Sequence, residues 1–480
     1  MHLANIALLL ICALSQIASA DLQASVEAIL RSAKLGGGSV SVCVIDSETN
    51  QTLVDINSSS PMIPASNQKL LTSGTAIHVL GPQFQFVTKL YWDKQNASLT
   101  ILGDGDPTIG DASLLGLQDW STENKLLRKE LEPWVHAVLE SGIETVNTVW
   151  TDDRIFDRNY VHPSWPANQI NNWYCAQVAG LNYHLNVVHF FPSPQTTTAS
   201  LGTIVPDMPW MTFGNKTTSK TGKNAKSSFW VARPPNSNKM TARGNVKGTH
   251  TQPVKVALHN PAEVFGQVLA RELRSSSIKV LHVTEVAEDA SSPQGTLLHE
   301  HTTPLETVLR RSNQDSHNLY AEALLKRTAA ASTGSSGTFD EGAFAVARSV
   351  SQRLDIPQSS LTPADGSGMS RDNRVSTFIL ASWLASFDLS DQAGTLLLNS
   401  LATPGTGTLK NRFADVELFE STVHAKSGYL SGVCALSGYL LTKEHHPIAF
   451  SIVVNGVKGS VRGAKKMQEN IIALLAQSYS

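Results

Sequence analysis

The sequence predicts an α+β fold in which both ends of the chain build one domain and the middle forms a large, mainly β insert. Alternating apolar segments near both termini are typical of strands, whereas residues from about 260 to 390 show the periodicity of amphipathic helices. Between them the chain has short β-like runs rich in glycine, proline and asparagine. We therefore expect a main domain from residues 21–89 and 256–480, and an inserted region from residues 90–255.

Length and composition agree with a folded protein of more than one domain. The chain has 480 residues, more than a single hydrophobic core normally holds. Charged residues make up 16% of the sequence and hydrophobic residues 41%, so the chain is not expected to be disordered. Its 38 basic and 40 acidic residues leave a formal net charge of -2, and no nucleic-acid partner is expected.

The first twenty residues have the composition of a secretory signal. An apolar run from Ile6 to Leu14 precedes Ala18-Ser19-Ala20, an A-x-A-like cleavage site, although His2 is the only ionisable side chain before the run. We expect cleavage after Ala20 and a secreted or periplasmic protein; an uncleaved anchor is the alternative. No later stretch reaches the roughly 18 apolar residues of a membrane span, so no integral membrane span is expected.

The N-terminal part of the main domain should carry a helix, a strand hairpin and a second helix. The expected elements are a helix over 22–35, strands over 38–46 and 51–57, and a helix starting near Ser66. Leu70, Gly74, Ile77 and Gly81 recur at helical spacing behind Ser66, and Gly81-Pro82 ends that helix.

The second half should carry helices followed by strands. The expected helices cover 261–280, 303–330, 342–355 and 376–390. Three strand candidates, 421–430, 434–442 and 448–456, precede a last helix over 464–477.

Ser66-Asn67-Gln68-Lys69 places a hydroxyl at a helix start and an amine one turn further on, because residues i and i+3 share a helix face. A serine becomes a nucleophile when a base takes its proton. A lysine can be that base if burial and neighbouring cations lower its pKa from about 10.4 toward 7–8. Ser276-Ser277-Ile278-Lys279 also matches, and a solvated helix face explains either pair taken alone. The hairpin before Ser66 and the apolar stripe after it favour the first copy.

A second polar element, Ser316-His317-Asn318, offers a hydroxyl and an amide two residues apart. A turn of this kind can aim both groups into a cleft, one to relay protons and one to hold a substrate amide. Taken alone it is explained by a polar turn before a helix, because Ser and Asn cap helices. We interpret His317 as a spacer rather than a base.

Two segments compete for a third element, a Lys-Ser/Thr-Gly box at a strand edge. There a lysine supplies a cation, a hydroxyl binds a substrate carboxylate, and glycine lets the backbone approach closely. Lys220-Thr221-Gly222 has the commoner spelling but lies in the polar, basic run 213–228, which predicts an exposed loop. Lys426-Ser427-Gly428 begins the C-terminal strands, and we favour it.

The cysteines do not indicate a disulfide or metal framework. Cys43, Cys175 and Cys434 remain after the expected cleavage, and each has apolar neighbours, so we expect buried small hydrophobic residues. No cysteine–histidine cluster has zinc-site spacing, and neither a metal nor a cofactor is expected.

The three elements in this order are the signature of penicillin-binding enzymes. The chain resembles the low-molecular-mass class C penicillin-binding proteins, the D-alanyl-D-alanine carboxypeptidase/endopeptidase group. The likeness covers nearly the whole mature chain and the large insert is typical of that group. The further segments that carry it are Leu102–Ile109, 149–157, 171–188, Asp365–Asn373 and Pro404–Phe413. His317 stands where aspartate is common and Ser427 where threonine is common, and neither change removes a catalytic group.

The resemblance implies a transpeptidase-like domain with an antiparallel sheet flanked by helices, and a cleft beside a helical cluster. It implies that Ser66 attacks the terminal D-Ala-D-Ala bond, with Lys69 as base and Ser316 and Lys426 passing a proton to the leaving group. Peptidoglycan stem peptides are the implied substrates, β-lactams the implied covalent inhibitors, and no cofactor is implied.

The resemblance also assigns substrate-binding positions. It implies that Asn318 holds the substrate amide and that Lys426 and Ser427 bind the terminal carboxylate, with Gly428 allowing close approach. By position match, the backbone N–H groups of Ser66 and Tyr429 form the oxyanion hole. The alternatives are a β-lactamase-like serine hydrolase and a secreted peptidoglycan-binding protein without turnover. The retained serines and lysines argue against the second.

Overall fold

Strands from the two ends of the chain pair with one another in a five-stranded antiparallel sheet. The computed structural model, which describes residues 21–292 and 294–479, gives this sheet the order β14-β15-β16-β1-β2. Where β1 meets β16, Ser39 lies opposite Asn455 and Asp46 lies opposite Ile448. The strands are β1 (Ser39–Asp46), β2 (Thr52–Ile56), β14 (Thr422–Leu430), β15 (Val433–Leu441) and β16 (Pro447–Asn455).

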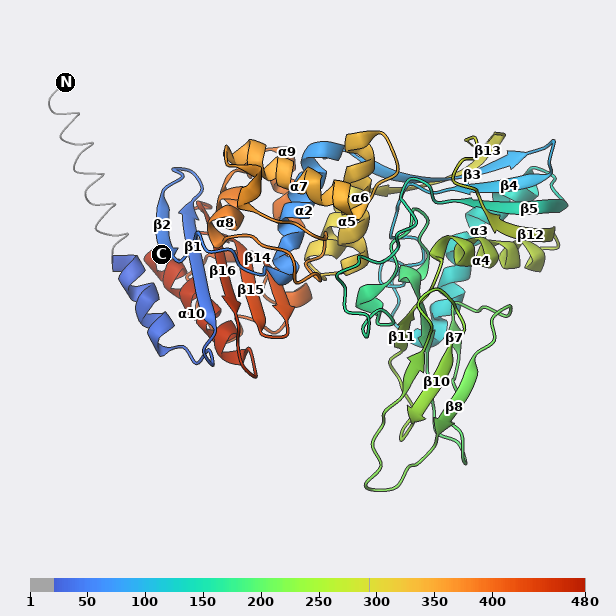
Figure 1. Cartoon of the computed structure of the whole chain (residues 1–480), viewed down its shortest axis with the longest axis horizontal. Coiled ribbons are helices and arrows are strands. Elements are labelled where there is room, and N and C mark those ends of the chain that lie inside the picture. Colours follow the sequence, from blue (N-terminus) through green and yellow to red (C-terminus); the bar gives the residue numbers. More distant parts are fainter. Residues whose placement is uncertain (1–20, 293, 480) are drawn as a thin grey trace. The chain divides into compact units, whose positions relative to one another are not determined.

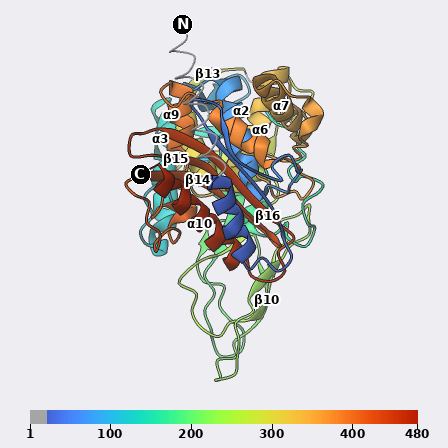
Figure 2. The ribbon, with the colours of Figure 1, turned by 90° about the vertical axis from the view of Figure 1, so that its left-hand side faces the viewer.

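Helices cover both faces of this sheet. Residues on both sides of the central strands are therefore buried. On one face α10 (Arg462–Ser478) and the helical residues 21–32 lie over the sheet (Figure 2). Their apolar side chains share a hydrophobic core with the strands, which includes Val42 and Ile471. On the other face α8 (Thr377–Ala385) contacts β1 and β16, and Thr377 Oγ1 lies 2.6 Å from Ser41 Oγ.

A helical cluster adjoins α8. At its centre α2 (Gln68–Leu80) packs against α7 (Phe339–Leu354), α8 and α9 (Gln392–Asn399). Two short 3-10 turns lie in the same part of the chain, η5 (Gln358–Ser360) and η6 (Gly407–Leu409). Together with the sheet these elements make up a first compact unit of residues 21–83, 309–317 and 339–479.

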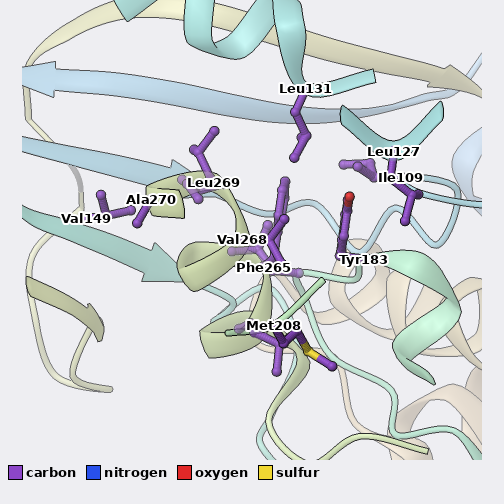
Figure 3. Packing of buried hydrophobic residues seen from close by; sticks show 14 of the residues in the cluster. Ile109, Leu127, Leu131, Val149, Tyr183, Met208, Phe265, Val268, Leu269 and Ala270 are labelled. Carbon is purple, nitrogen blue, oxygen red and sulfur yellow. The ribbon is translucent and has the colours of Figure 1, made fainter. Parts of the chain in front are cut away.

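The remaining residues, 84–308 and 318–338, form a second compact unit. It contains the expected insert 90–255, and also residues 84–89, 256–308 and 318–338, which the sequence assigns to the main domain. Its main sheet is mixed and has the order β12-β5-β4-β3-β13 (Figure 1). Helices α3 (Glu123–Glu140) and α4 (Pro261–Ser275) pack their apolar faces into one core, where Leu131 and Phe265 lie (Figure 3). The strands are β3 (Gln85–Asp93), β4 (Ser98–Leu102), β5 (Thr145–Asp152), β12 (Lys279–Glu285) and β13 (Thr296–Pro304).

Two three-stranded sheets, β11-β6-β7 and β8-β10-β9, complete the second unit. Their strands are β6 (Val187–Phe190), β7 (Ile204–Val205), β8 (Gly214–Thr218), β9 (Trp230–Ala232), β10 (Thr241–Asn245) and β11 (Val254–Ala257). Short 3-10 turns are η2 (Trp120–Thr122), η3 (Trp173–Cys175) and η4 (His184–Asn186). In the described residues, no helix is long and apolar enough to cross a membrane. The expected signal, residues 1–20, lies outside them.

The structure corrects two expected helices. The segment 303–330 is divided into α5 (Leu305–Asn313) and α6 (Asn318–Thr333), because Ser316 takes a left-handed conformation with φ 59. The segment 261–280 is helical only to Ser275; Ser277 has φ 67, and β12 starts at Lys279. The second Ser-x-x-Lys motif therefore does not share a helix face.

Two smaller expectations have mixed outcomes. The run 213–228 is mostly exposed, but its first part forms β8, paired in parallel with β10. The expectation for the cysteines is confirmed, since Cys43, Cys175 and Cys434 are buried free thiols. Burial raises the pKa of Cys43 to about 12.

Candidate active site

Ser66 lies in a 3-10 turn, η1 (Ala65–Asn67), directly before α2. The Lys69 amine, one turn along, donates to Ser66 Oγ over 3.3 Å and to the carbonyl oxygen of Ser367 over 2.7 Å. Lys69 is fully buried, whereas Ser66 is half-buried. The residue before the serine, Ala65, is held at φ 48, a strained conformation of a kind that often occurs at functional sites. The fold thus fixes a buried amine against a partly accessible hydroxyl.

A loop over Asp365–Asn373 holds this turn from behind. The Asp365 carboxylate accepts hydrogen bonds from the backbone N–H of Gly368 (2.8 Å) and Ser370 (2.6 Å) and from Asn373 Nδ2 (2.8 Å). A Cβ on Gly368 would lie 1.8 Å from the Ala65 carbonyl oxygen, so only glycine allows this approach. The sequence did not predict the Ser367 carbonyl as a partner of Lys69. The motif Asp365-Gly366-Ser367-Gly368 was the feature of the sequence that could have indicated it.

Strand β14 brings the Lys426-Ser427-Gly428 box against the same turn. A Cβ on Gly428 would lie 2.9 Å from the Pro64 carbonyl oxygen and 3.1 Å from Ser66 N, so its backbone is packed on the serine. Side chains two apart on a strand share a face, and Lys426 therefore projects on the same side of β14 as this contact.

Lys426 is fully buried, and its amine donates to the Ser427 carbonyl oxygen over 2.8 Å. Burial and the charge of Lys69 lower the pKa of Lys426 well below its ordinary value, and Asp315 acts in the opposite direction. Two lysines are thus buried close enough to influence each other's ionisation beside one serine.

The position of β14 at the sheet edge decides where its N–H groups point. Ala425 N donates to the Ala402 carbonyl oxygen over 2.8 Å, and this bond is directed away from β15. N–H groups alternate along a strand, so those of Ser427 and Tyr429 point the same way. The Tyr429 side chain is 62% exposed. The Ser427 side chain lies on the opposite face of β14 from Lys426.

The turn that carries Ser316 is joined to α2. Asn313 Nδ2 donates to Ser73 Oγ over 3.0 Å and to Ser400 Oγ over 2.8 Å, all within the first unit. Ser316 itself is half-buried and left-handed, with φ 59, and the charge of the preceding Asp315 acts on Lys426. The structure therefore gathers Ser66, Lys69 and Lys426 at the start of α2, and it joins Asn313, three residues before Ser316, to the middle of the same helix.

Asn318 and the competing Lys220 belong to the second unit, and His317 ends a segment of the first unit. Asn318 begins α6 in the second unit, where its Nδ2 donates to the Tyr174 carbonyl oxygen over 2.8 Å. His317 is buried, and its backbone N–H donates to the Arg311 carbonyl oxygen over 3.2 Å. Lys220 of the competing box is exposed in the second unit.

Comparison with known proteins decides the family. The family model of D-Ala-D-Ala carboxypeptidase 3 (S13) matches residues 22–478. The chain belongs to this family. Among curated members, a D-alanyl-D-alanine carboxypeptidase from an Actinomadura strain is 27% identical over 95% of this chain and 85% of its own length. A penicillin-sensitive carboxypeptidase A from Dictyostelium discoideum is 22% identical over 88% of this chain and 84% of its own.

Solved structures give the same fold. The structure of penicillin binding protein 4 from Haemophilus influenzae matches this chain with a TM-score of 0.77 and 23% sequence identity. The match covers 94% of this chain and 99% of that one. A second structure of that protein, in complex with a β-lactam, matches with a TM-score of 0.70. The predicted α+β penicillin-binding fold is confirmed, as is the prediction of a serine-type D-Ala-D-Ala carboxypeptidase, a hydrolase.

Proposed function

We propose that this carboxypeptidase acts outside the cytoplasm on peptidoglycan stem peptides that end in D-Ala-D-Ala, through an acyl intermediate on Ser66. The observation that carries the proposal is the 3.3 Å contact from the buried Lys69 amine to Ser66 Oγ, with Gly428 packed on Ser66 N. A base within hydrogen-bond reach of the hydroxyl is the geometry that serine activation requires.

In the acylation step Lys69 takes the proton of Ser66 Oγ, and this oxygen bonds to the carbonyl carbon of the penultimate D-alanine. The C–N bond to the terminal D-alanine then breaks. The proton passes from Lys69 through the Ser316 hydroxyl to the leaving amine, so charge and protons balance. Water attacks the ester in the second step with Lys69 again as base, and Ser66 is regenerated.

Lys426 supports this transfer through its lowered pKa. A buried ammonium beside a second lysine gives up a proton more readily than an exposed one, because burial and like charge both disfavour the cation. Lys426 is therefore suited to assist Ser316 in protonating the leaving amine. A substrate carboxylate placed beside it would restore the cation, which couples substrate binding to the charge state of the site.

The edge of β14 supplies the remaining contacts of the proposal. The N–H groups of Ser66 and Tyr429 stabilise the oxyanion, and the outward direction of Tyr429 N–H supports this role. Lys426 and Ser427 bind the terminal carboxylate, and Gly428 lets the peptide approach the strand. Asn318 holds the substrate amide. The side chains of Lys426 and Ser427 lie on opposite faces of β14.

β-Lactams should acylate the same serine. The similar Haemophilus influenzae protein has been solved with a β-lactam, and the Dictyostelium relative is named penicillin-sensitive. Both support the proposal for this chain.

The proposal is tested by the product released. The purified enzyme should release D-alanine from a diacylated peptide ending in D-Ala-D-Ala, and Ser66→Ala should release none. Ser276→Ala, which removes the serine of the second Ser-x-x-Lys motif, is the matched control and should behave as wild type. Release by Ser66→Ala would overturn the assignment. A cross-linked muropeptide dimer measured beside the peptide separates endopeptidase from carboxypeptidase action.

A further inference from the structure

We propose that Glu123, His184 and His189 of the second unit bind one first-row divalent metal ion, with zinc as the expected ion. Among the residues that the structure describes, these three form the one group of histidine, cysteine and carboxylate side chains whose donor atoms converge, all within 4.8 Å of one another. None of them takes part in the proposed acyl transfer, so this inference does not depend on it.

The spacing of the donor atoms suits a metal. His184 Nε2 lies 3.1 Å from one Glu123 oxygen, and His189 Nδ1 lies 2.9 Å from the other. Zinc binds imidazole nitrogen and carboxylate oxygen at about 2.0–2.2 Å, so neighbouring ligands of a tetrahedral site lie about 3.3 Å apart. An ion therefore needs only small movements of these side chains. Three protein ligands leave a fourth position for water or another donor.

The hydrogen bond of His184 on its other side orients it as a ligand. Its Nδ1 lies 2.8 Å from the Val187 carbonyl oxygen, which can only accept, so Nδ1 must carry the proton. In the neutral ring Nε2 then presents a lone pair toward the lone pairs of Glu123. Either a proton or a metal ion must lie between these atoms. A backbone carbonyl that fixes the tautomer of a histidine is a common feature of metal sites.

All three side chains are almost completely buried, at 0–1% exposure, so the site is shielded from bulk solvent. The surroundings of a metal site control the access of solvent to the ion.

The backbone that presents His184 is strained. His184, Leu185 and Asn186 have φ values of 50, 57 and 57, three left-handed residues in succession, none of them glycine. Asn186 Nδ2 holds the turn through the Gln177 carbonyl oxygen at 2.7 Å and Asn182 Oδ1 at 2.6 Å. This turn leads directly into β6, so His184 and His189 come together over a short loop, and Glu123 reaches them from the start of α3.

The test uses the untagged full-length protein and Zn²⁺ as the probe. The protein is dialysed against excess zinc and then against metal-free buffer. Elemental mass spectrometry should then find about one zinc ion per chain in wild type. Glu123→Gln and His184→Gln should lower the zinc affinity by about 100-fold or more, because each removes a ligand. His446→Gln is the matched control and should keep the metal. His446 contacts Asp46 through Nε2 and Glu48 through Nδ1, each at 3.0 Å, so the two carboxylates meet opposite nitrogens of its ring.

Three further readouts keep the result clear if a variant fails to fold. Cobalt-loaded wild type should show the visible absorption of a tetrahedral nitrogen and oxygen site, and X-ray absorption of the zinc form should show two imidazoles. Zinc should also raise the Tm of wild type and of His446→Gln but not of His184→Gln. A wild type without stoichiometric zinc, or zinc without imidazole ligands, would overturn the proposal and leave a protonated His184–Glu123 pair.

Discussion

Gly428→Ala tests how closely β14 must approach the nucleophile turn. The added methyl would lie 2.9 Å from the Pro64 carbonyl oxygen, 3.1 Å from Asn67 Oδ1 and 3.1 Å from Ser66 N. Two of these three neighbours are backbone atoms, so they cannot rotate away. They must move by a few tenths of an ångström, and the strained Ala65 lies between Pro64 and Ser66. The change therefore acts on the position of the serine and on its N–H group.

The expected effects on rate and on stability are of similar size in free energy. Overpacking costs about 1–3 kcal/mol, but alanine in a strand gains about 0.5–1 kcal/mol over glycine, so the net loss is at most about 2.5 kcal/mol. Misplacing a reacting group by 1 Å costs about 100-fold in rate, and losing one oxyanion donor costs about 100- to 1,000-fold. The added methyl group should displace Ser66 by a few tenths of an ångström and partly block its N–H group. Together these effects should slow acylation by about 10- to 100-fold.

The assay is the second-order rate of acylation by a fluorescent penicillin, beside Tm. Gly222→Ala in the competing Lys-Thr-Gly box is the control, because no atom lies within 4 Å of its added Cβ. That variant should react as wild type. A Gly428→Ala enzyme that acylates within about twofold of wild type while folded would refute the close approach described above.

Three further predictions concern Lys426. Lys426→Ala should abolish acylation while Lys220→Ala leaves it near normal in the same penicillin assay; the reverse result would place the box at residue 220. The acylation rate of wild type should fall as pH rises through the lowered pKa of Lys426, well below the usual lysine range, and a rate that is flat up to about pH 10 contradicts this. Lys426→Met should stabilise the fold at neutral pH by about 1–4 kcal/mol in thermal unfolding. This gain should shrink toward about pH 10.4, where the unfolded wild type also loses its proton, and a gain that grows with pH has the wrong sign.

Local patterns predicted the elements that follow a simple period. The helix behind Ser66 and the strands at both ends were visible because their apolar residues recur at 3.6 or 2 residues. The choice between two lysine boxes also came from sequence, since Lys426 lies in a strand pattern and Lys220 in a polar run.

What the sequence did not show depends on single residues in unusual conformations or on distant contacts. Ser316 at φ 59 divides a segment whose apolar period continues through it, so the pattern predicted one helix. The bond from Lys69 to Ser367 joins residues 298 apart in the chain. Likewise Glu123 lies 61 residues from His184, and no local motif announces their contact.

The central claim is that Ser66 carries the acyl group, and intact-mass analysis with benzylpenicillin tests it most directly. Folded wild type should gain the mass of one penicillin, digestion should place it on the peptide that contains Ser66, and Ser66→Ala should gain none. A folded wild type that gains no mass, or an adduct that persists in Ser66→Ala, would contradict the account.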